Sequence, residues 1–137
     1  MGLLKPSSSG VMLSQPNLLY IAIFILLFFV CFKHQACFLP GTLALGYHHG
    51  LPRSHLELAE QLAYTCYLTF ARSPTHLAPE ISYFNTEPSS SEDFYCKPND
   101  AHYLLRPETI ESLWYLYVVT GNRTYQDWGW KIFQVRT

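Results

Sequence analysis

The chain carries little charge and no excess of one sign. Of its 137 residues, 9 are Lys or Arg and 10 are Asp or Glu, which gives a formal net charge of -1. A protein that binds nucleic acid through its phosphates needs a basic surface, so we expect no nucleic-acid partner. Blocks of like charge that would form an acidic tail are also missing.

Metal-binding cysteine patterns are missing as well. The chain has four cysteines: Cys31, Cys37, Cys66 and Cys96. None forms a Cys-x-x-Cys pair or lies at metal-ligand spacing from a histidine pair, so we expect no zinc site. An even number of cysteines allows a disulfide in an oxidising compartment. The Asn-Arg-Thr sequon at residues 122–124 agrees with such a compartment, but a glycan can be attached there only if the turn faces solvent.

One long hydrophobic run lies near the start of the chain. Residues 1–17 are rich in Ser and Pro and show no periodicity, which predicts a disordered lead. Fifteen apolar or aromatic residues without a charge follow at 18–32, and Lys33 ends the run. A spanning helix needs about 20 apolar residues, with a lower limit near 17, so this run is slightly short. We expect residues 18–33 to form a hydrophobic helix that seeks a bilayer.

Three origins of this hydrophobic segment stay open. It could be a signal anchor that holds the chain in a membrane. It could be a secretory signal peptide, although no small-x-small cleavage site stands out after it. It could also be non-native sequence up to residue 35, because translation of a pyrimidine-rich intron end and its CAG acceptor would give a Phe, Leu and Ile rich run ending in Gln.

Residues 104–134 predict a pair of antiparallel helices. Pro107 suits the first helical position, and Gly121 suits a left-handed helix stop. The first helix repeats apolar residues at helical spacing: Ile110, Leu113, Trp114 and Tyr117. The second helix is expected to carry an apolar face of Tyr125, Trp128, Ile132 and Phe133. Gly129 would allow close approach of a neighbouring element.

A further helix is predicted at about residues 55–71. Ser54 followed by Glu57 is the pattern of a capping box at its start. Its expected core face consists of Leu56, Ala59, Ala63, Cys66 and Phe70.

Two carboxylates mark the start of the first helix of the pair. Glu108 and Glu111 are three residues apart, so both should lie on one helix face beside Arg106. A simple alternative is that acidic residues in a first turn complement the helix dipole. The residues alone therefore indicate only an unspecified sugar or cation site.

Three motifs together resemble glycoside hydrolase family 47, the class I α-1,2-mannosidases that trim N-linked glycans. Residues 104–134 contain LLRPETIESLWYLYVVTG and then YQDWGW, which match that family's signature nearly residue for residue. Residues 37–46, CFLPGTLALG, resemble the endoplasmic-reticulum type, and LAPE at 77–80 is similar to the family's LSPE. The resemblance implies an all-α fold in which residues 37–137 form part of an (αα)7 barrel of helical hairpins.

The resemblance also implies roles for individual residues. Glu108 would be a base or a carboxylate near a bound Ca²⁺, and Glu80 an acid or an assisting carboxylate. Arg106 would bind both a sugar and a carboxylate. Glu111 would accept a hydrogen bond from a group that itself contacts the sugar. His34 stands where the family has a substrate-contacting histidine, and the alternative is a solvated histidine beside Lys33. The remaining histidines show no ligand spacing.

A disulfide is implied by the same resemblance. The family pairs the cysteine of its CFLPG motif with one in the following helix, which here are Cys37 and Cys66. The loop closed by such a bond should stabilise the fold by roughly 3 to 4 kcal/mol. Two free buried thiols are the alternative if the chain never reaches an oxidising compartment. Cys96 departs from the family pattern and is given no role.

The implied activity is inverting, Ca²⁺-dependent hydrolysis of terminal α-1,2-linked mannose from high-mannose N-linked glycans. It would take place on the lumenal side of endoplasmic reticulum or Golgi membranes. The family's upstream acidic motifs and its C-terminal calcium-binding threonine have no counterpart here, so we expect the chain alone to be inactive. Two alternatives are a non-catalytic mannose-binding or glycoprotein quality-control relative, and a functionless truncated isoform. An incomplete barrel would expose Leu113, Tyr117 and Trp128 and favour aggregation.

Overall fold

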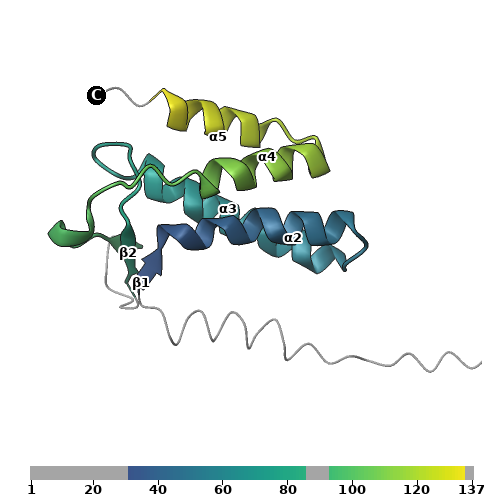
Figure 1. The fold of residues 1–137 in the computed structure, drawn as a ribbon, viewed down its shortest axis with the longest axis horizontal. Coiled ribbons are helices and arrows are strands. Elements are labelled where there is room, and N and C mark those ends of the chain that lie inside the picture. Colours follow the sequence, from purple (N-terminus) through teal and green to yellow (C-terminus); the bar gives the residue numbers. More distant parts are fainter. Residues whose placement is uncertain (1–30, 86–92, 135–137) are drawn as a thin grey trace, which may run out of the picture.

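The computed structural model describes residues 31–85 and 93–134 (Figure 1). The elements, in chain order, are β1 (Cys31–Lys33), the 3-10 helix η1 (His34–Phe38), α2 (Leu39–His48), α3 (Arg53–Ala71), β2 (Ile81–Phe84), β3 (Phe94–Tyr95), the 3-10 helix η2 (Pro98–Asp100), α4 (Glu108–Thr120) and α5 (Thr124–Phe133). The predominance of helix confirms the predicted class. The four α-helices pack against one another in a way compatible with part of a helical barrel.

Helix α4 lies at the centre of the packing. It contacts α2, α3 and α5, and its first turns also contact η1. In Figure 1 it runs between α5 on one side and the α2–α3 pair on the other. Because the Arg-Pro-Glu motif stands at the start of α4, its carboxylate is carried by a helix that packs against three others.

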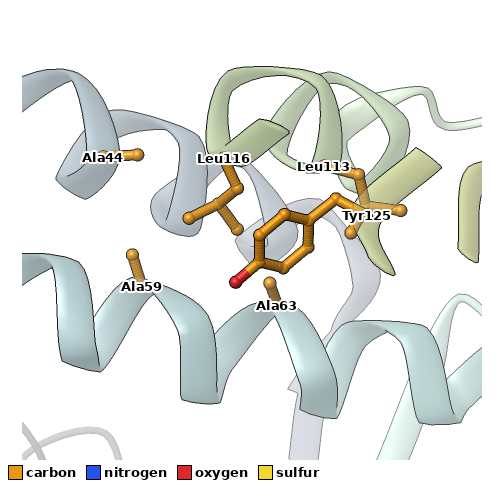
Figure 2. Packing of buried hydrophobic residues seen from close by; sticks show 6 residues of the cluster. All are labelled: Ala44, Ala59, Ala63, Leu113, Leu116 and Tyr125. Atoms are coloured by element: carbon orange, nitrogen blue, oxygen red, sulfur yellow. The ribbon is translucent and has the colours of Figure 1, made fainter. Parts of the chain in front are cut away.

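The hydrophobic core is built from small residues on two helices and larger ones on the others. Its members are Ala44, Ala59, Ala63, Leu113, Leu116 and Tyr125. In Figure 2 the ring of Tyr125 points from α5 toward Ala63 of α3. The alanines let the helices approach closely, and Leu116 is fully buried among them. The hydroxyl of Tyr125 donates a hydrogen bond of 3.2 Å to Glu60 at the edge of this core.

A small antiparallel sheet, which the predicted all-α class did not include, joins the segment before η1 to the segments that follow α3. Its strand order is β1-β2-β3, and its register pairs Cys31 with Tyr83 and Lys33 with Ile81. The last residues of the predicted hydrophobic helix, Cys31–Lys33, are therefore strand. Pairing with the aromatic and β-branched residues of β2 satisfies their backbone groups instead.

The rest of that predicted helix, residues 18–30, lies outside the described residues, as does the predicted lead 1–17. Among the helices that the structure describes, none has the length and apolar character needed to cross a membrane.

Helix α3 confirms the predicted core face but not the predicted cap. Ala59, Ala63, Cys66 and Phe70 are all buried, with Thr69 beside them. The helix begins at Arg53 with Pro52 as its N-cap residue, and no side chain caps it. The capping box at Ser54 was therefore wrong, because the extended conformation of Pro52 starts the helix earlier and leaves Ser54 inside the first turn.

Helix α4 ends as predicted but is rotated from its predicted orientation. Gly121 follows it with a φ of 70°. Its buried residues are Thr109, Ser112, Leu113 and Leu116, whereas Ile110 is 39% exposed and Trp114 is 57% exposed. The predicted apolar face was wrong at those two positions because hydrogen bonds to η1 turn Thr109 and Ser112 inward.

Two predictions for α5 were also wrong. Phe133 is 76% exposed, and a Cβ added to Gly129 would meet no atom within 4 Å. The prediction that an incomplete barrel exposes Leu113 and Trp128 was also wrong. Leu113 is buried, and Trp128 stacks on Tyr67 with ring centroids 4.7 Å apart. The large hydrophobic residues that α4 and α5 do expose are Ile110, Trp114, Val118, Trp130 and Phe133.

Candidate functional site

Arg106 and Glu80 form a two-pronged ion pair at the start of α4. Arg106 Nε donates to Glu80 Oε2 at 2.7 Å, and Nη2 donates to Oε1 at 2.5 Å. Their side chains are only 25% and 14% exposed. A guanidinium fork that meets both carboxylate oxygens fixes the orientation of both groups. The pair therefore joins residues 26 positions apart in the sequence.

The backbone of Glu80 is held from two directions. Its N–H points at the carbonyls of Asp100 and His102, each at 3.0 Å, and its carbonyl accepts a 2.9 Å hydrogen bond from the N–H of His34. These bonds connect the segment before β2 with η2 and with the start of η1. The carboxyl group of Glu80 is thus fixed to the scaffold independently of Arg106.

Arg106 is presented by an unusual backbone conformation. Leu105, just before it, has a φ of 53° although its side chain is 81% exposed. A left-handed conformation costs a residue with a Cβ about 1–2 kcal/mol, so the surrounding structure must hold it. The hydroxyl of Tyr103 donates to the carbonyl of Arg106 at 3.2 Å, which is one such contact.

Glu108, the first residue of α4, carries a buried oxygen with no partner. Its Oε1 lies 3.9 Å from Arg106 Nη1, and its side chain is 19% exposed. Its Oε2 is buried and makes no hydrogen bond. Burying such an acceptor is unfavourable unless a ligand supplies a donor or a cation. The arrangement therefore fits a carboxylate whose second oxygen is completed by a ligand or a cation.

His34 is buried beside the two glutamates, which excludes the alternative of a solvated histidine. It is 1% exposed, and its Nε2 lies 3.3 Å from the hydroxyl of Thr109. The rings of Phe70 and Tyr103 meet it edge-on at 5.1 and 6.2 Å. Its Nδ1 is a second buried atom without a hydrogen-bond partner.

The charged groups of the site change one another's pKa values. The hydrogen bonds from Arg106 lower the pKa of Glu80 below its usual value. The same contact raises the pKa of Arg106. Burial lowers the pKa of His34, against the opposing influence of Glu108 and Glu80. At neutral pH the site thus holds an ionised Glu80–Arg106 pair next to a neutral imidazole.

Of the predicted site residues, only Glu111 stays apart from this group. Its side chain is exposed, and no ion pair connects it with Arg106 among residues 31–85 and 93–134. The structure brings together Glu80, Arg106, Glu108 and His34. Arg106 reaches back to Glu80 with its two short hydrogen bonds and lies 3.9 Å from Glu108.

The disulfide between Cys37 and Cys66 is confirmed, with Cα atoms 5.9 Å apart. It ties η1 to α3. The hydroxyl of Ser112 on α4 donates a 2.5 Å hydrogen bond to the carbonyl of Cys37. The segment that carries His34 is therefore held by both helices.

Thr109, Ser112 and Tyr103 support the site, and the sequence analysis missed all three. Thr109 and Ser112 are three residues apart on α4 and both 1% exposed. The available signal was a pair of small polar residues at helical spacing among apolar ones. A helix face with such residues is buried only when another element satisfies their hydroxyls. Tyr103 had no comparable signal.

The described residues do not by themselves form a metal centre. Nowhere in residues 31–85 and 93–134 do three His, Cys, Asp or Glu side chains gather closely enough to hold an ion. The buried Oε2 of Glu108 fits the hard oxygen ligation that Ca²⁺ prefers, but only as one contributor.

Comparisons with known proteins agree with this picture. The sequence pattern of glycosyl hydrolase family 47 matches residues 18–136. We had expected the resemblance to start at Cys37, so the match begins 19 residues earlier than expected. The endoplasmic reticulum mannosyl-oligosaccharide 1,2-alpha-mannosidase of Homo sapiens is 60% identical over 102 residues, which cover 74% of this chain and 15% of that protein. Its Rattus norvegicus counterpart is 58% identical over 102 residues, covering 74% and 16%.

A plant protein shows the same relationship at lower identity. The mannosyl-oligosaccharide 1,2-alpha-mannosidase MNS3 of Arabidopsis thaliana is 41% identical over 128 residues, with 74% of this chain and 20% of that protein covered. The chain thus spans about 15% to 20% of the length of these relatives. The match to the family pattern extends over most of the chain, and the chain belongs to glycosyl hydrolase family 47.

Proposed function

We propose that this chain supplies part of the active site of an α-1,2-mannosidase that removes terminal mannose from high-mannose N-linked glycans with inversion. Membership of the family and the relatives' names support the reaction class. The observation that carries the proposal is the buried, unpartnered Oε2 of Glu108 beside the Arg106–Glu80 pair.

Glu108 acts as the general base in this proposal. Inversion requires a carboxylate that takes a proton from water while the water oxygen bonds to the anomeric carbon and the bond to the leaving sugar oxygen breaks. Within residues 31–85 and 93–134, Glu108 is the carboxylate with a buried oxygen that accepts no hydrogen bond from the protein. Arg106, 3.9 Å away, keeps it oriented and is placed to hold a sugar hydroxyl.

Glu80 is a positioning residue and not the proton donor. Its two hydrogen bonds from Arg106 hold the pKa of its carboxyl low, so it stays ionised. A general acid needs its proton near neutral pH, which requires a raised pKa. The proton donor must therefore be another group. We propose that this group lies in a part of the enzyme that this chain does not supply, and we therefore expect no turnover by this chain on its own.

Two further groups complete the proposed site. A bound Ca²⁺, with Glu108 nearby, would supply electrostatic binding of sugar hydroxyls and of the attacking water. His34 contacts the Thr109 hydroxyl and the rings of Phe70 and Tyr103, and in this proposal it contributes to substrate binding. Glu111, exposed three residues after Glu108 on the first turn of α4, is the remaining candidate for sugar contact.

We place this activity in the lumen of the endoplasmic reticulum or Golgi, with residues 18–30, the part of the hydrophobic run before β1, attaching the chain to the membrane. The names of the mammalian relatives and the Cys37–Cys66 disulfide support an oxidising compartment. Extraction of cell membranes with alkaline carbonate tests the attachment: the chain should stay in the pellet, and its release would contradict the anchor.

A segment exchange tests the catalytic proposal. The 102-residue segment of the human relative that matches this chain is replaced by the corresponding residues of this chain, and mannose released from a high-mannose glycan is measured with Ca²⁺. We expect the hybrid to turn over and Glu108→Gln to lower its rate by about 10²- to 10⁴-fold. Glu57→Gln is the control, because Glu57 is exposed and its ion pair is with Arg53, on the surface of α3.

The outcomes separate the candidate functions. A hybrid that binds mannose oligosaccharide but never releases mannose would favour the non-catalytic, quality-control alternative. A correctly folded hybrid with neither binding nor turnover would favour a functionless segment. Turnover by the unmodified chain alone, lost on Glu108→Gln, would contradict our claim that the proton donor lies elsewhere.

A further inference from the structure

The turn between α4 and α5 carries the sole Asn-x-Ser/Thr sequon of the sequence, at residues 122–124. All four residues from Gly121 to Thr124 are exposed. A Cβ placed on Gly121 would meet no atom within 4 Å, so the space around the turn is open. The condition set by the sequence, that this turn face solvent, is therefore met.

The backbone at the turn holds the Asn122 side chain by its oxygen. The N–H of Thr124 donates a 3.0 Å hydrogen bond to Asn122 Oδ1, and the N–H of Asn122 donates to Thr120 Oγ1 at 3.1 Å. This is an Asx-turn, in which the side chain bonds the backbone two residues on. Within the part of the chain that the structure describes, no hydrogen bond uses Asn122 Nδ2, so the nitrogen is not engaged by the protein.

The turn is also remote from the proposed site. Glu108 and Thr120 are at opposite ends of α4, about 18 Å apart at 1.5 Å per residue. Figure 1 shows the α4–α5 turn at the end of α4 away from the small sheet. A bulky group on residue 122 would therefore leave the surroundings of Arg106 and Glu108 open.

We propose that Asn122 is an acceptor for an N-linked glycan, an inference that rests on the lumenal location in the proposed function. The donor class is an oligosaccharide linked to a lipid diphosphate. Asn122 Nδ2 bonds to the anomeric carbon of that saccharide while the bond from this carbon to the diphosphate oxygen breaks. The electron pair leaves with the lipid diphosphate, and one Nδ2 proton passes to a base. The Thr124 hydroxyl completes the recognised motif.

The test uses the full chain, tagged at its C-terminus, in cultured human cells. A glycosidase that cleaves N-linked glycans should lower its apparent mass by one step on a gel. Asn122→Gln and Thr124→Ala should abolish the shift, whereas Thr124→Ser should keep it because the hydroxyl is retained. Alkylation of free thiols followed by a non-reducing gel reports the Cys37–Cys66 disulfide in the same samples.

The disulfide separates failure of the glycan site from failure of the location. A disulfide without a mass shift would overturn the glycan site while the lumenal location stands. Reduced cysteines without a shift would overturn both. A shift that persists in Asn122→Gln would also contradict the proposal, since the glycan would then be attached elsewhere.

Discussion

The backbone N–H of Gly41 donates a 2.9 Å hydrogen bond to the hydroxyl of Ser112 where α2 crosses α4. A Cβ on residue 41 would lie 3.1 Å from Ser112 Oγ and 3.2 Å from Ser112 Cα. We expect Gly41→Ala to lower the free energy of unfolding by about 1 to 3 kcal/mol, because the two helices must move apart. Pulse proteolysis in increasing urea measures the change at low protein concentration.

Gly129→Ala is the matched control for that substitution. Residue 129 is inside α5, and an added Cβ meets nothing within 4 Å. Alanine should raise the free energy of unfolding by about 0.5 to 1 kcal/mol through its better helix propensity. Similar losses in both variants would show that the close α2–α4 approach is not the cause.

Removal of the disulfide should destabilise the chain substantially. The bond between Cys37 and Cys66 spans 29 positions, which corresponds to about 3 to 4 kcal/mol in the chain-entropy estimate. Cys37→Ser is expected to show this loss in urea unfolding, and reductant should then have no further effect on it. Cys96→Ser is the control because Cys96 is a free thiol, and a comparable loss there would contradict the assignment.

Stability should fall as the pH drops below about 6.5. Burial lowers the pKa of His34, so the unfolded chain takes up the proton first and is favoured. The effect is absent above the unfolded pKa and grows until the pH reaches the folded pKa. Urea midpoints between pH 5 and 7.5 measure the slope, which His34→Gln should reduce.

Glu80 provides the control for that pH range. Because Arg106 lowers the pKa of Glu80, its contribution is present above about pH 4.5 and is lost only at more acidic pH. Glu80→Gln should therefore keep the slope between pH 5 and 7.5 and make it steeper, because the Glu80 charge opposes the lowering of the His34 pKa. If instead this variant removes the slope and His34→Gln does not, the assignment to His34 is wrong.

Alkaline pH should destabilise the fold through Tyr125. Burial, together with the neighbouring Glu60, raises the pKa of Tyr125 to about 12. The unfolded chain loses its phenolic proton near pH 10, so stability falls as the pH rises from about 10 to about 12. Tyr125→Phe should flatten this part of the urea-midpoint curve. Some slope should remain from Tyr103, whose pKa burial also raises.

Local patterns in the sequence predicted the elements that depend on local interactions. Gly121 ends α4 because a left-handed residue is needed there, and α3 buries Ala59, Ala63 and Cys66 at helical spacing. The resemblance to the family supplied the Cys37–Cys66 pairing. Burial on α4 and α5 was not predictable in the same way, because a hydrophobic residue such as Phe133 is buried only if another element covers it.

The site shows the same division between local and distant interactions. Sequence spacing placed Arg106 beside Glu108 and Glu111, but the guanidinium turns to Glu80, 26 residues earlier. Two hydrogen bonds to the carboxylate of Glu80 stabilise the Arg106 guanidinium more than an exposed ion pair with Glu111 on the helix would. The strand β1 was also missed, because three residues at the end of an apolar run form a strand only when β2 is present to pair with them.

Two contacts on one turn of α4 set the position of η1: Thr109 meets His34, and Ser112 meets the carbonyl of Cys37. Insertion or deletion of one residue between Glu108 and Ser112 would rotate the helix start by about 100° relative to the rest of α4. Both contacts and the placement of Glu108 could not then be kept together. This turn can therefore accept a changed side chain more readily than a changed length.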